Sequence, residues 1–176
     1  MSKNFELLLD DYAGKVSEVT AVKQYFHHHL VVEEEDVAEL LEDVAIEEMK
    51  HMDQLGNFLE EAGVDPRIWD AEERYWSGDY VNYQYDVCDI LRADIDAELE
   101  AILQYYQHIE AISDPQVEMM LNRIIKDELR HIGLFMQKLS KYCSDFNQKS
   151  WLRSKIEELP ISITAKKQVL NGLQLI

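Results

Sequence analysis

The sequence predicts an all-α protein: a four-helix bundle made of two helical hairpins, with a long crossover between them and a short helical tail at the C-terminal end. Three observations support this prediction. Only six glycines and three prolines occur among 176 residues, which leaves room for long helices within a single domain. Apolar residues recur at helical spacing in four long segments. The first half of the chain also matches the second half after a shift of 80 positions.

The four segments are separated by residues that begin or end helices. Gly63 follows the second segment, and Asp36 is placed to cap its start. Between the third and fourth segments, Ser113-Asp114-Pro115 forms a turn in which Asp114 caps a helix that Pro115 begins. The expected helices are 3–34, 37–62, 85–112 and 115–144, with the crossover at 65–83.

The remaining residues form the tail. Pro160 divides it into one or two short helices, and its apolar side predicts packing on the bundle or on a neighbouring subunit. We therefore expect a bundle over 1–145 and a helical tail over 146–176.

The internal repeat preserves polar residues without any gap. Chance can match single apolar residues in a helical protein, but matched polar residues at matched spacing are much harder to explain in that way. The polar pairs are Glu18 with Glu98, Gln24 with Gln104, Tyr25 with Tyr105, His28 with His108, Glu48 with Glu128 and His51 with His131.

Four of these residues are glutamates that the hairpins should place at one height. Glu18 and Glu48 lie 30 residues apart, as do Glu98 and Glu128, and each hairpin turns near the midpoint. A helix rises ~1.5 Å per residue, so equal distances up and down return the chain to the same level. In each Glu-x-x-His segment the histidine lies one turn after the glutamate, on the same face.

These side chains continue the apolar stripes of their helices, where unneutralised carboxylates are costly. Lys15 is the single cationic candidate on the inner faces, and it cannot balance four glutamates. Two divalent cations would do so, with two histidines as neutral donors. The expected metal ligands are Glu18, Glu48, His51, Glu98, Glu128 and His131. The alternative is a set of buried Glu–His hydrogen bonds without metal.

The same residues resemble the ferritin-like superfamily, and within it bacterioferritin and the rubrerythrin-like and manganese-catalase-like proteins. The resemblance spans about 4–144 and rests on Glu18, Gln24-Tyr25-Phe26, Glu48-Met49-Lys50-His51, Ala97-Glu98 and Asp127-Glu128-Leu129-Arg130-His131. The crossover is more aromatic than expected of a bacterioferritin, and the cysteine-ligated iron domain of rubrerythrin is absent from the sequence.

The resemblance implies a centre of two iron ions bridged by Glu48 and Glu128. Glu18 with His51 and Glu98 with His131 would be the terminal ligands, or the pairs would be crossed. It also implies oxidation of Fe(II) by O₂ or H₂O₂, with iron storage or peroxide detoxification as the outcome, in a homo-oligomer that is a dimer or a larger cage.

Two other functions use the same residues. A manganese-catalase-like protein would hold two manganese ions in this ligand set, because oxygen and nitrogen donors suit Fe and Mn alike. A non-catalytic metal-binding or assembly module would hold an inert metal pair or none.

Several neighbouring residues have more than one interpretation. Tyr25 and Tyr105 lie two turns after Glu18 and Glu98, where each could hydrogen-bond a ligand, supply an electron or simply pack in the core. Glu47 and Asp127 could orient the histidines or face solvent. In bacterioferritin a methionine at the place of Met49 ligates haem across a subunit two-fold, so haem is a further hypothesis here.

Composition excludes some partners and suggests a location. A formal charge of −18 disfavours nucleic acid, and no apolar run approaches the ~20 residues that a membrane span needs. The N-terminal residues do not resemble a signal peptide. Cys88 and Cys143 form no C-x-x-C pair and are expected to be free thiols, which suits the cytoplasm.

Overall fold

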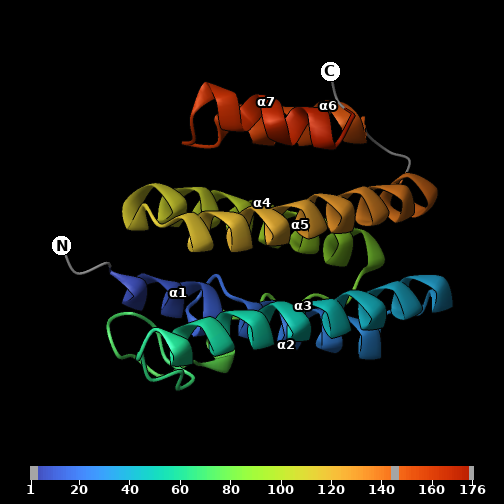
Figure 1. Cartoon of the computed structure of the whole chain (residues 1–176). Coiled ribbons are helices and arrows are strands. Elements are labelled where there is room, and N and C mark those ends of the chain that lie inside the picture. The colour runs from blue at the N-terminus through green and yellow to red at the C-terminus, as the bar shows by residue number, and fades with distance from the viewer. Residues whose placement is uncertain (1–3, 144–146, 175–176) are drawn as a thin grey trace.

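The computed structural model describes residues 4–143 and 147–174, and it confirms the all-α fold. Its helices lie in three layers: α1, α2 and α3 form one, α4 and α5 the next, and α6 and α7 the third (Figure 1). The α-helices are α1 (Leu8–Ala13), α2 (Glu18–Val31), α3 (Glu35–Glu61), α4 (Val87–Ile112), α5 (Pro115–Tyr142), α6 (Gln148–Glu158) and α7 (Ile163–Gly172), with 3₁₀ turns η1 (Phe5–Leu7) and η2 (Gly78–Tyr80).

The first expected helix, 3–34, is divided in the structure, so that prediction was wrong in its continuity. Helix α1 ends at Ala13, and α2 begins only at Glu18. Between them, the Ser17 hydroxyl donates to the Gly14 carbonyl at 2.7 Å and accepts from the Thr20 amide at 3.2 Å. Serine and threonine hydroxyls compete with helical backbone bonds in this way. The break makes Glu18 the first residue of a new helix.

The cap predicted at Asp36 was also wrong. Helix α3 begins at Glu35 and its N-cap residue makes no side-chain hydrogen bond. The Asp36 carboxylate instead accepts bonds from Lys138 Nζ at 2.6 Å, Lys141 Nζ at 3.0 Å and the Tyr142 hydroxyl. It therefore joins the start of α3 to the end of α5.

The second hairpin follows its predicted turn. The Asp114 side chain accepts from the amides of Gln116 and Val117, and Pro115 begins α5. Helix α4 starts at Val87, two residues later than expected, where Asp86 caps it. The hairpins α2–α3 and α4–α5 share one apolar core, in which Tyr25 meets Phe135 edge to face.

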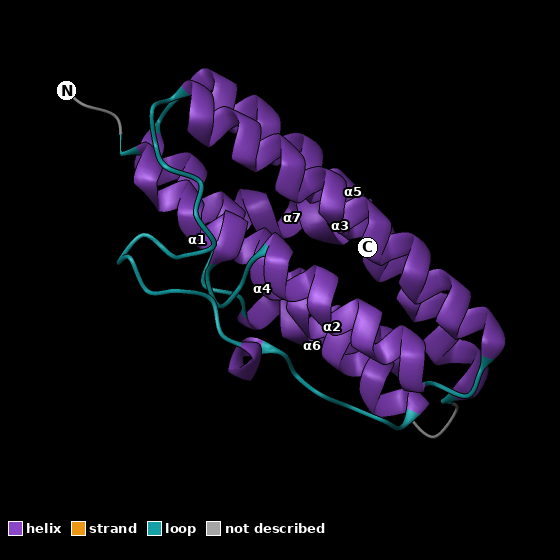
Figure 2. Ribbon diagram, turned by 90° about the horizontal axis from the view of Figure 1, so that it is seen from below, coloured by secondary structure: helices purple, strands orange, loops and turns teal. Residues whose placement is uncertain are grey.

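The crossover from α3 to α4 is anchored along the first layer (Figure 2). Trp76 donates its indole N–H to Thr20 Oγ1 at 2.9 Å, and the Ala71 amide donates to Asp10 Oδ1 at 2.9 Å. These bonds hold the crossover against the α1–α2 break, so the chain passes close to Glu18.

The tail helices cover the outer side of α4 and α5 (Figure 1). Leu152 and Ile156 of α6 are buried in the common core, and Lys155 Nζ lies 2.7 Å from Asp96 Oδ1 on α4. Pro160 lies between α6 and α7, as expected. The division into a bundle over 1–145 and a tail over 146–176 stays a prediction.

The cysteines are not free thiols, so that expectation was wrong. Cys88 and Cys143 form a disulfide with a Cα–Cα distance of 5.9 Å. Helices α4 and α5 are antiparallel and similar in length, so the start of one lies beside the end of the other. The argument for a reducing compartment no longer applies, and the cytoplasmic location stays a prediction.

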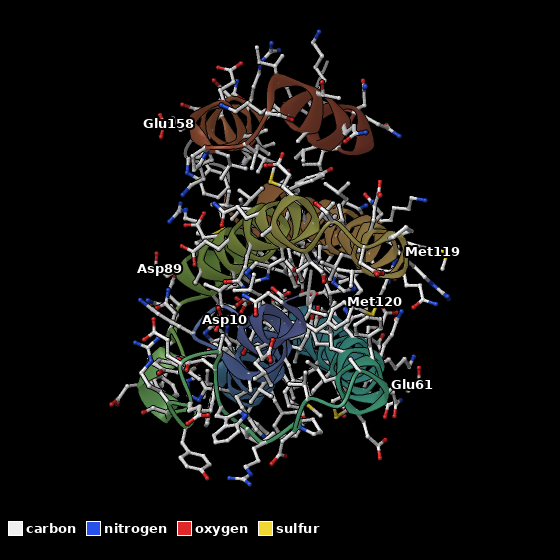
Figure 3. All side chains as sticks on the ribbon, turned by 60° about the vertical axis from the view of Figure 1, so that its left-hand side comes forward. Asp10, Glu61, Asp89, Met119, Met120 and Glu158 are labelled. Atoms are coloured by element: carbon white, nitrogen blue, oxygen red, sulfur yellow. A yellow bond between two sulfur atoms is a disulfide. The ribbon has the colours of Figure 1, made fainter. Side chains whose placement is uncertain are left out.

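The surface carries much of the excess acid. Glu61, Asp89 and Glu158 lie exposed at the periphery (Figure 3). None of the helices in the described ranges combines the length and the apolar character that a membrane span requires.

Candidate metal centre

The six predicted ligand residues come from four helices and meet in the middle of the bundle. Glu18 begins α2, Glu98 lies in α4, and the two Glu-x-x-His segments lie in α3 and α5. All six residues are buried, none with more than 6 % of its surface exposed. They are Glu18, Glu48, His51, Glu98, Glu128 and His131.

Their donor atoms form two overlapping groups. Glu18, Glu48, His51 and Glu128 make one, and Glu48, Glu98, Glu128 and His131 make the other. Within each group the atoms lie within 4.8 Å of one another, a spacing that can surround one ion. Glu48 and Glu128 belong to both, as expected of bridging ligands. Glu18 falls with His51, so the geometry favours the uncrossed pairing.

Both histidines turn Nδ1 toward the carboxylates. His51 Nδ1 lies 2.8 Å from Glu48 and 3.3 Å from Glu128. His131 Nδ1 lies 2.9 Å from Glu48 and 3.0 Å from Glu128. Glu48 Oε1 is buried, and its one close donor atom among the described residues is His131 Nδ1 at 2.9 Å, in a direction poor for a hydrogen bond. An oxygen of this kind is suited to a cation, so the cluster fits a di-metal site.

The pKa values of two cluster glutamates also indicate a site that is suited to cations. Burial raises the pKa of Glu18 to about 7, and Glu48 adds to the rise while His51 opposes it. Burial also raises the pKa of Glu128 well above its usual value, with further contributions from Glu48 and Glu98. Protons compensate part of the charge when no metal is bound.

The pKa values of the two histidines are also raised, which for an imidazole favours the positively charged form. Burial lowers the pKa of His51, but hydrogen bonds to Glu128, Glu18 and Glu48 outweigh burial and raise it. His131 behaves in the same way, with Glu128, Glu48 and Glu98 as its partners. Both imidazoles therefore bind protons that a metal ion must displace.

The two tyrosines reach across the bundle. Tyr25 on α2 donates its hydroxyl to Glu98 on α4 at 2.8 Å, and Tyr105 on α4 donates to Glu18 on α2. Both rings are fully buried or nearly so. Each tyrosine thus supports the glutamate of the other hairpin, a pairing that helical periodicity alone did not identify.

The outer ring nitrogens have their own partners. His131 Nε2 lies 2.8 Å from Glu47 Oε2, and Arg130 also bonds to that carboxylate. His51 Nε2 lies 3.5 Å from Asp127 Oδ2. The structure therefore places Glu47 and Asp127 beside the histidines, and these contacts fix the direction of Nδ1.

A further set of paired contacts lies outside the ligand cluster and joins residues of α1 and α2 to residues of α4. His28 Nδ1 lies 2.8 Å from Asp94 Oδ1, to which Gln24 also donates. Its counterpart is His108 with Asp11 and Gln104: His108 Nδ1 lies 2.8 Å from Asp11 Oδ2, and Gln104 donates to Asp11 Oδ1. Sequence reasoning missed Asp94 because the repeat aligns it with Gly14 rather than with Asp11. The break between α1 and α2 shifts one half relative to the other by about one turn.

A cavity of about 330 Å³ lies between α2 and α4 and reaches the cluster. Exposed Lys15 and Glu100 are part of its lining, as are Tyr80 and Asn82 of the crossover. The inner lining consists of Glu18, Tyr25, Glu48, Glu98, Tyr105 and Glu128. A small molecule can therefore approach the ligands from the side of the bundle that the crossover borders.

Met49 lies outside this cluster. Its side chain is 44 % exposed on α3, beside Ile46, which is 42 % exposed. Haem ligation at Met49 stays a hypothesis.

Comparisons with known proteins agree with the fold. The model of the ferritin-like domain matches residues 16–143. A probable manganese catalase of Clostridium acetobutylicum is 22 % identical, covering 82 % of this chain and 74 % of the relative. A crystal structure of a manganese catalase from Anabaena has a TM-score of 0.76 at 28 % identity, covering 83 % of this chain and 76 % of the other. A dodecameric thioferritin related to bacterioferritin, from Bacteroides fragilis, has a TM-score of 0.64 at 20 % identity, covering 84 % and 93 %.

Proposed function

Because this chain belongs to the ferritin-like family, we propose that it is a di-metal oxidoreductase that consumes hydrogen peroxide, with manganese as its metal. The observation that carries this proposal is the pair of ligand groups that share Glu48 and Glu128. The likeness to a manganese catalase at 28 % identity supports the choice of metal and of peroxide. The overall reaction converts two H₂O₂ into O₂ and two H₂O, so one peroxide is oxidised by two electrons and the other is reduced.

In that reaction, residues of this chain would hold the metal ions, orient the ligands and exclude bulk water. Glu18, Glu48, His51, Glu98, Glu128 and His131 would hold a pair of redox-active ions, which would supply the two-electron change when bound. Glu18 lies at the inner end of the cavity, where it belongs to the ligand group of Glu48, His51 and Glu128. Tyr25 and Tyr105 keep Glu98 and Glu18 directed inward. Burial of the cluster excludes bulk water.

The test begins with protein loaded separately with Mn(II) and with Fe(II). We expect two manganese ions per chain and release of one O₂ for every two H₂O₂ consumed. Glu48→Gln should lose metal and activity, whereas Glu60→Gln, an exposed change on the same helix, should retain both. Turnover that is equal in wild type and Glu48→Gln would refute the proposal.

A second function, oxidation of Fe(II) by O₂ or H₂O₂, is favoured by the acidic lining of the cavity. Asp96 and Glu100 accompany the four cluster glutamates there, with Lys15 as the one basic lining residue among those described. Such a lining attracts cations. Rapid Fe(II) oxidation without O₂ release, in a protein that stays inactive with manganese, would establish this function instead.

We also propose a homo-oligomer, as one structural relative is dodecameric. Phe26, Leu30, Ile46 and Met49 give α2 and α3 exposed apolar side chains that a second copy could cover. Light scattering at several concentrations tests this, and a monomer at every concentration would reject it.

A Soret band after expression with haem, absent in Met49→Leu, would support haem at that face.

A further inference from the structure

An apolar groove lies between α5 and the tail helices, outside the metal centre, and the tail side of its lining lies beyond the residues that the family model matches. Its volume is about 800 Å³, within the range of small-molecule sites. It follows α5 from Lys126 to Ser140, a length of about 20 Å at helical rise. Its apolar lining consists of Leu129, Leu134, Met136, Leu152 and Leu173.

Gly133 gives this groove space in the middle of α5. Glycine is among the least favourable residues inside a helix, so a structural reason is expected for it. At Gly172 an added Cβ would lie 2.8 Å from Leu129 Cδ1, so close packing accounts for that glycine. At Gly133 an added Cβ would meet nothing within 4 Å. Packing therefore does not explain Gly133, whereas an occupant of the groove would.

The charged side chains among the described residues that line the groove are all basic. Lys126 and Arg130 lie toward one end of it and Lys149 toward the other, and no acidic side chain is among the described residues that line it. This is unusual in a chain with 35 acidic residues and 17 Lys and Arg. A long apolar floor with cations at its ends is complementary to an amphiphile with an anionic head group.

We propose that this groove binds a linear amphipathic carboxylate of the fatty-acid class, with its alkyl chain along α5 across Gly133. The head group lies beside Lys126 or Lys149, which are both exposed. Arg130 also bonds to Glu47 next to the metal centre, so it is left unchanged in the test.

The test uses dodecanoate below its micellar concentration, with calorimetry on the full chain. We expect saturable binding of one dodecanoate per chain. Gly133→Leu should weaken binding by at least about tenfold, because the added side chain fills the floor. Gly133→Ala should raise Tm, because alanine favours the helix, and it serves to show that substitution at this position leaves the fold intact.

Charge variants provide the second arm. Lys126→Gln combined with Lys149→Gln should weaken dodecanoate binding by at least about tenfold and leave dodecanol binding unchanged. The single variants then identify the end that holds the head group. Lys167→Gln, an exposed change on α7 away from the groove, should bind as wild type does.

Five results would overturn the proposal, four of them with the full-length chain. Those four are no binding of monomeric dodecanoate, equal binding of dodecyltrimethylammonium, undiminished binding in a folded Gly133→Leu protein, and binding to phosphatidylglycerol vesicles alone. A chain ending at Gln174 that binds dodecanoate when the full chain does not would also overturn it. The groove would then belong to the chain's own last residues.

Discussion

Each histidine of the metal centre has a partner at its outer nitrogen, but the two partners are unequal. Glu47 lies at hydrogen-bonding distance from His131, whereas Asp127 lies 3.5 Å from His51. Partners of this kind typically change metal affinity by about 10–100-fold. We expect Glu47→Ala to weaken metal binding within that range and Asp127→Ala to weaken it less. Competition with a chromophoric chelator measures both, and the reverse order would contradict the interpretation.

Metal binding should release protons from this site. The pKa of Glu18 is raised to about 7, and the pKa values of His51 and His131 are raised above their usual range. These groups bear protons in the metal-free chain and must lose them to become ligands. Apparent affinity should therefore fall as pH drops from 8 to 6. Calorimetry in buffers of different ionisation enthalpy counts the protons, and a value of zero at pH 7 would be incompatible with this view.

The gathering of the six candidate ligands could be predicted from sequence, because charge, spacing and repetition agreed on them. The partners of the tyrosines could not. Periodicity places Tyr25 on the face of Glu18, but only the packing of the two hairpins brings its hydroxyl to Glu98. Asp94 was missed because the repeat aligns it with Gly14, and its partners Gln24 and His28 lie on the other hairpin, where only packing brings them close.

At the scale of elements, the break between α1 and α2 determines where Glu18 stands. A Cβ at Gly14 would lie 2.6 Å from the carbonyl oxygen of Asp10, which is backbone and cannot move aside easily. We expect Gly14→Ala to destabilise the fold by about 1–3 kcal/mol. Urea unfolding measures this change, and Gly133→Ala, at an open helical position, is the control that should stabilise. A neutral Gly14→Ala would show that the break can relax.

The disulfide acts on another element, the α4–α5 hairpin. It closes a loop of 55 residues, and chain entropy predicts about 4 kcal/mol of stabilisation for a loop of that length. Replacing both Cys88 and Cys143 by serine should lower the free energy of unfolding by up to that amount. Metal binding should be unchanged. Reduction of wild type should reproduce the loss, and reduction should leave the double variant unchanged. The antiparallel hairpin that places its two glutamates at one height also brings Cys88 close to Cys143. The residue types alone do not show that these two cysteines form a disulfide.

Across the whole molecule, the buried cluster should destabilise the metal-free fold. The pKa of Glu128 is raised by burial and then by Glu48 and Glu98, so its charged form is disfavoured in the folded state. A raised carboxyl pKa lowers stability as pH rises above the unfolded value of about 4.5. At pH 8, Glu128→Gln should therefore stabilise metal-free protein by about 1–4 kcal/mol. This gain should vanish near pH 4.

Metal should reverse the order of these two proteins. Two ions, each present at 100 times its dissociation constant, add about 5 kcal/mol to wild type, which exceeds the difference between the metal-free proteins. Glu128→Gln should gain little, because it lacks a ligand shared by both ion positions. Thermal unfolding with and without Mn(II) compares them, and Glu60→Gln should follow wild type throughout. Parallel gains in Glu128→Gln and wild type would exclude the cluster as the site of binding.

The crossover has a consequence for how the centre assembles. Each group of candidate ligands contains residues from both hairpins, so the chain is in effect a tethered dimer whose two halves together build the candidate metal centre. Tethering fixes the local concentration of one half around the other, commonly in the millimolar range for short linkers. Formation of the centre is therefore a first-order event, insensitive to dilution, and the site is complete within one polypeptide whatever larger assembly forms around it.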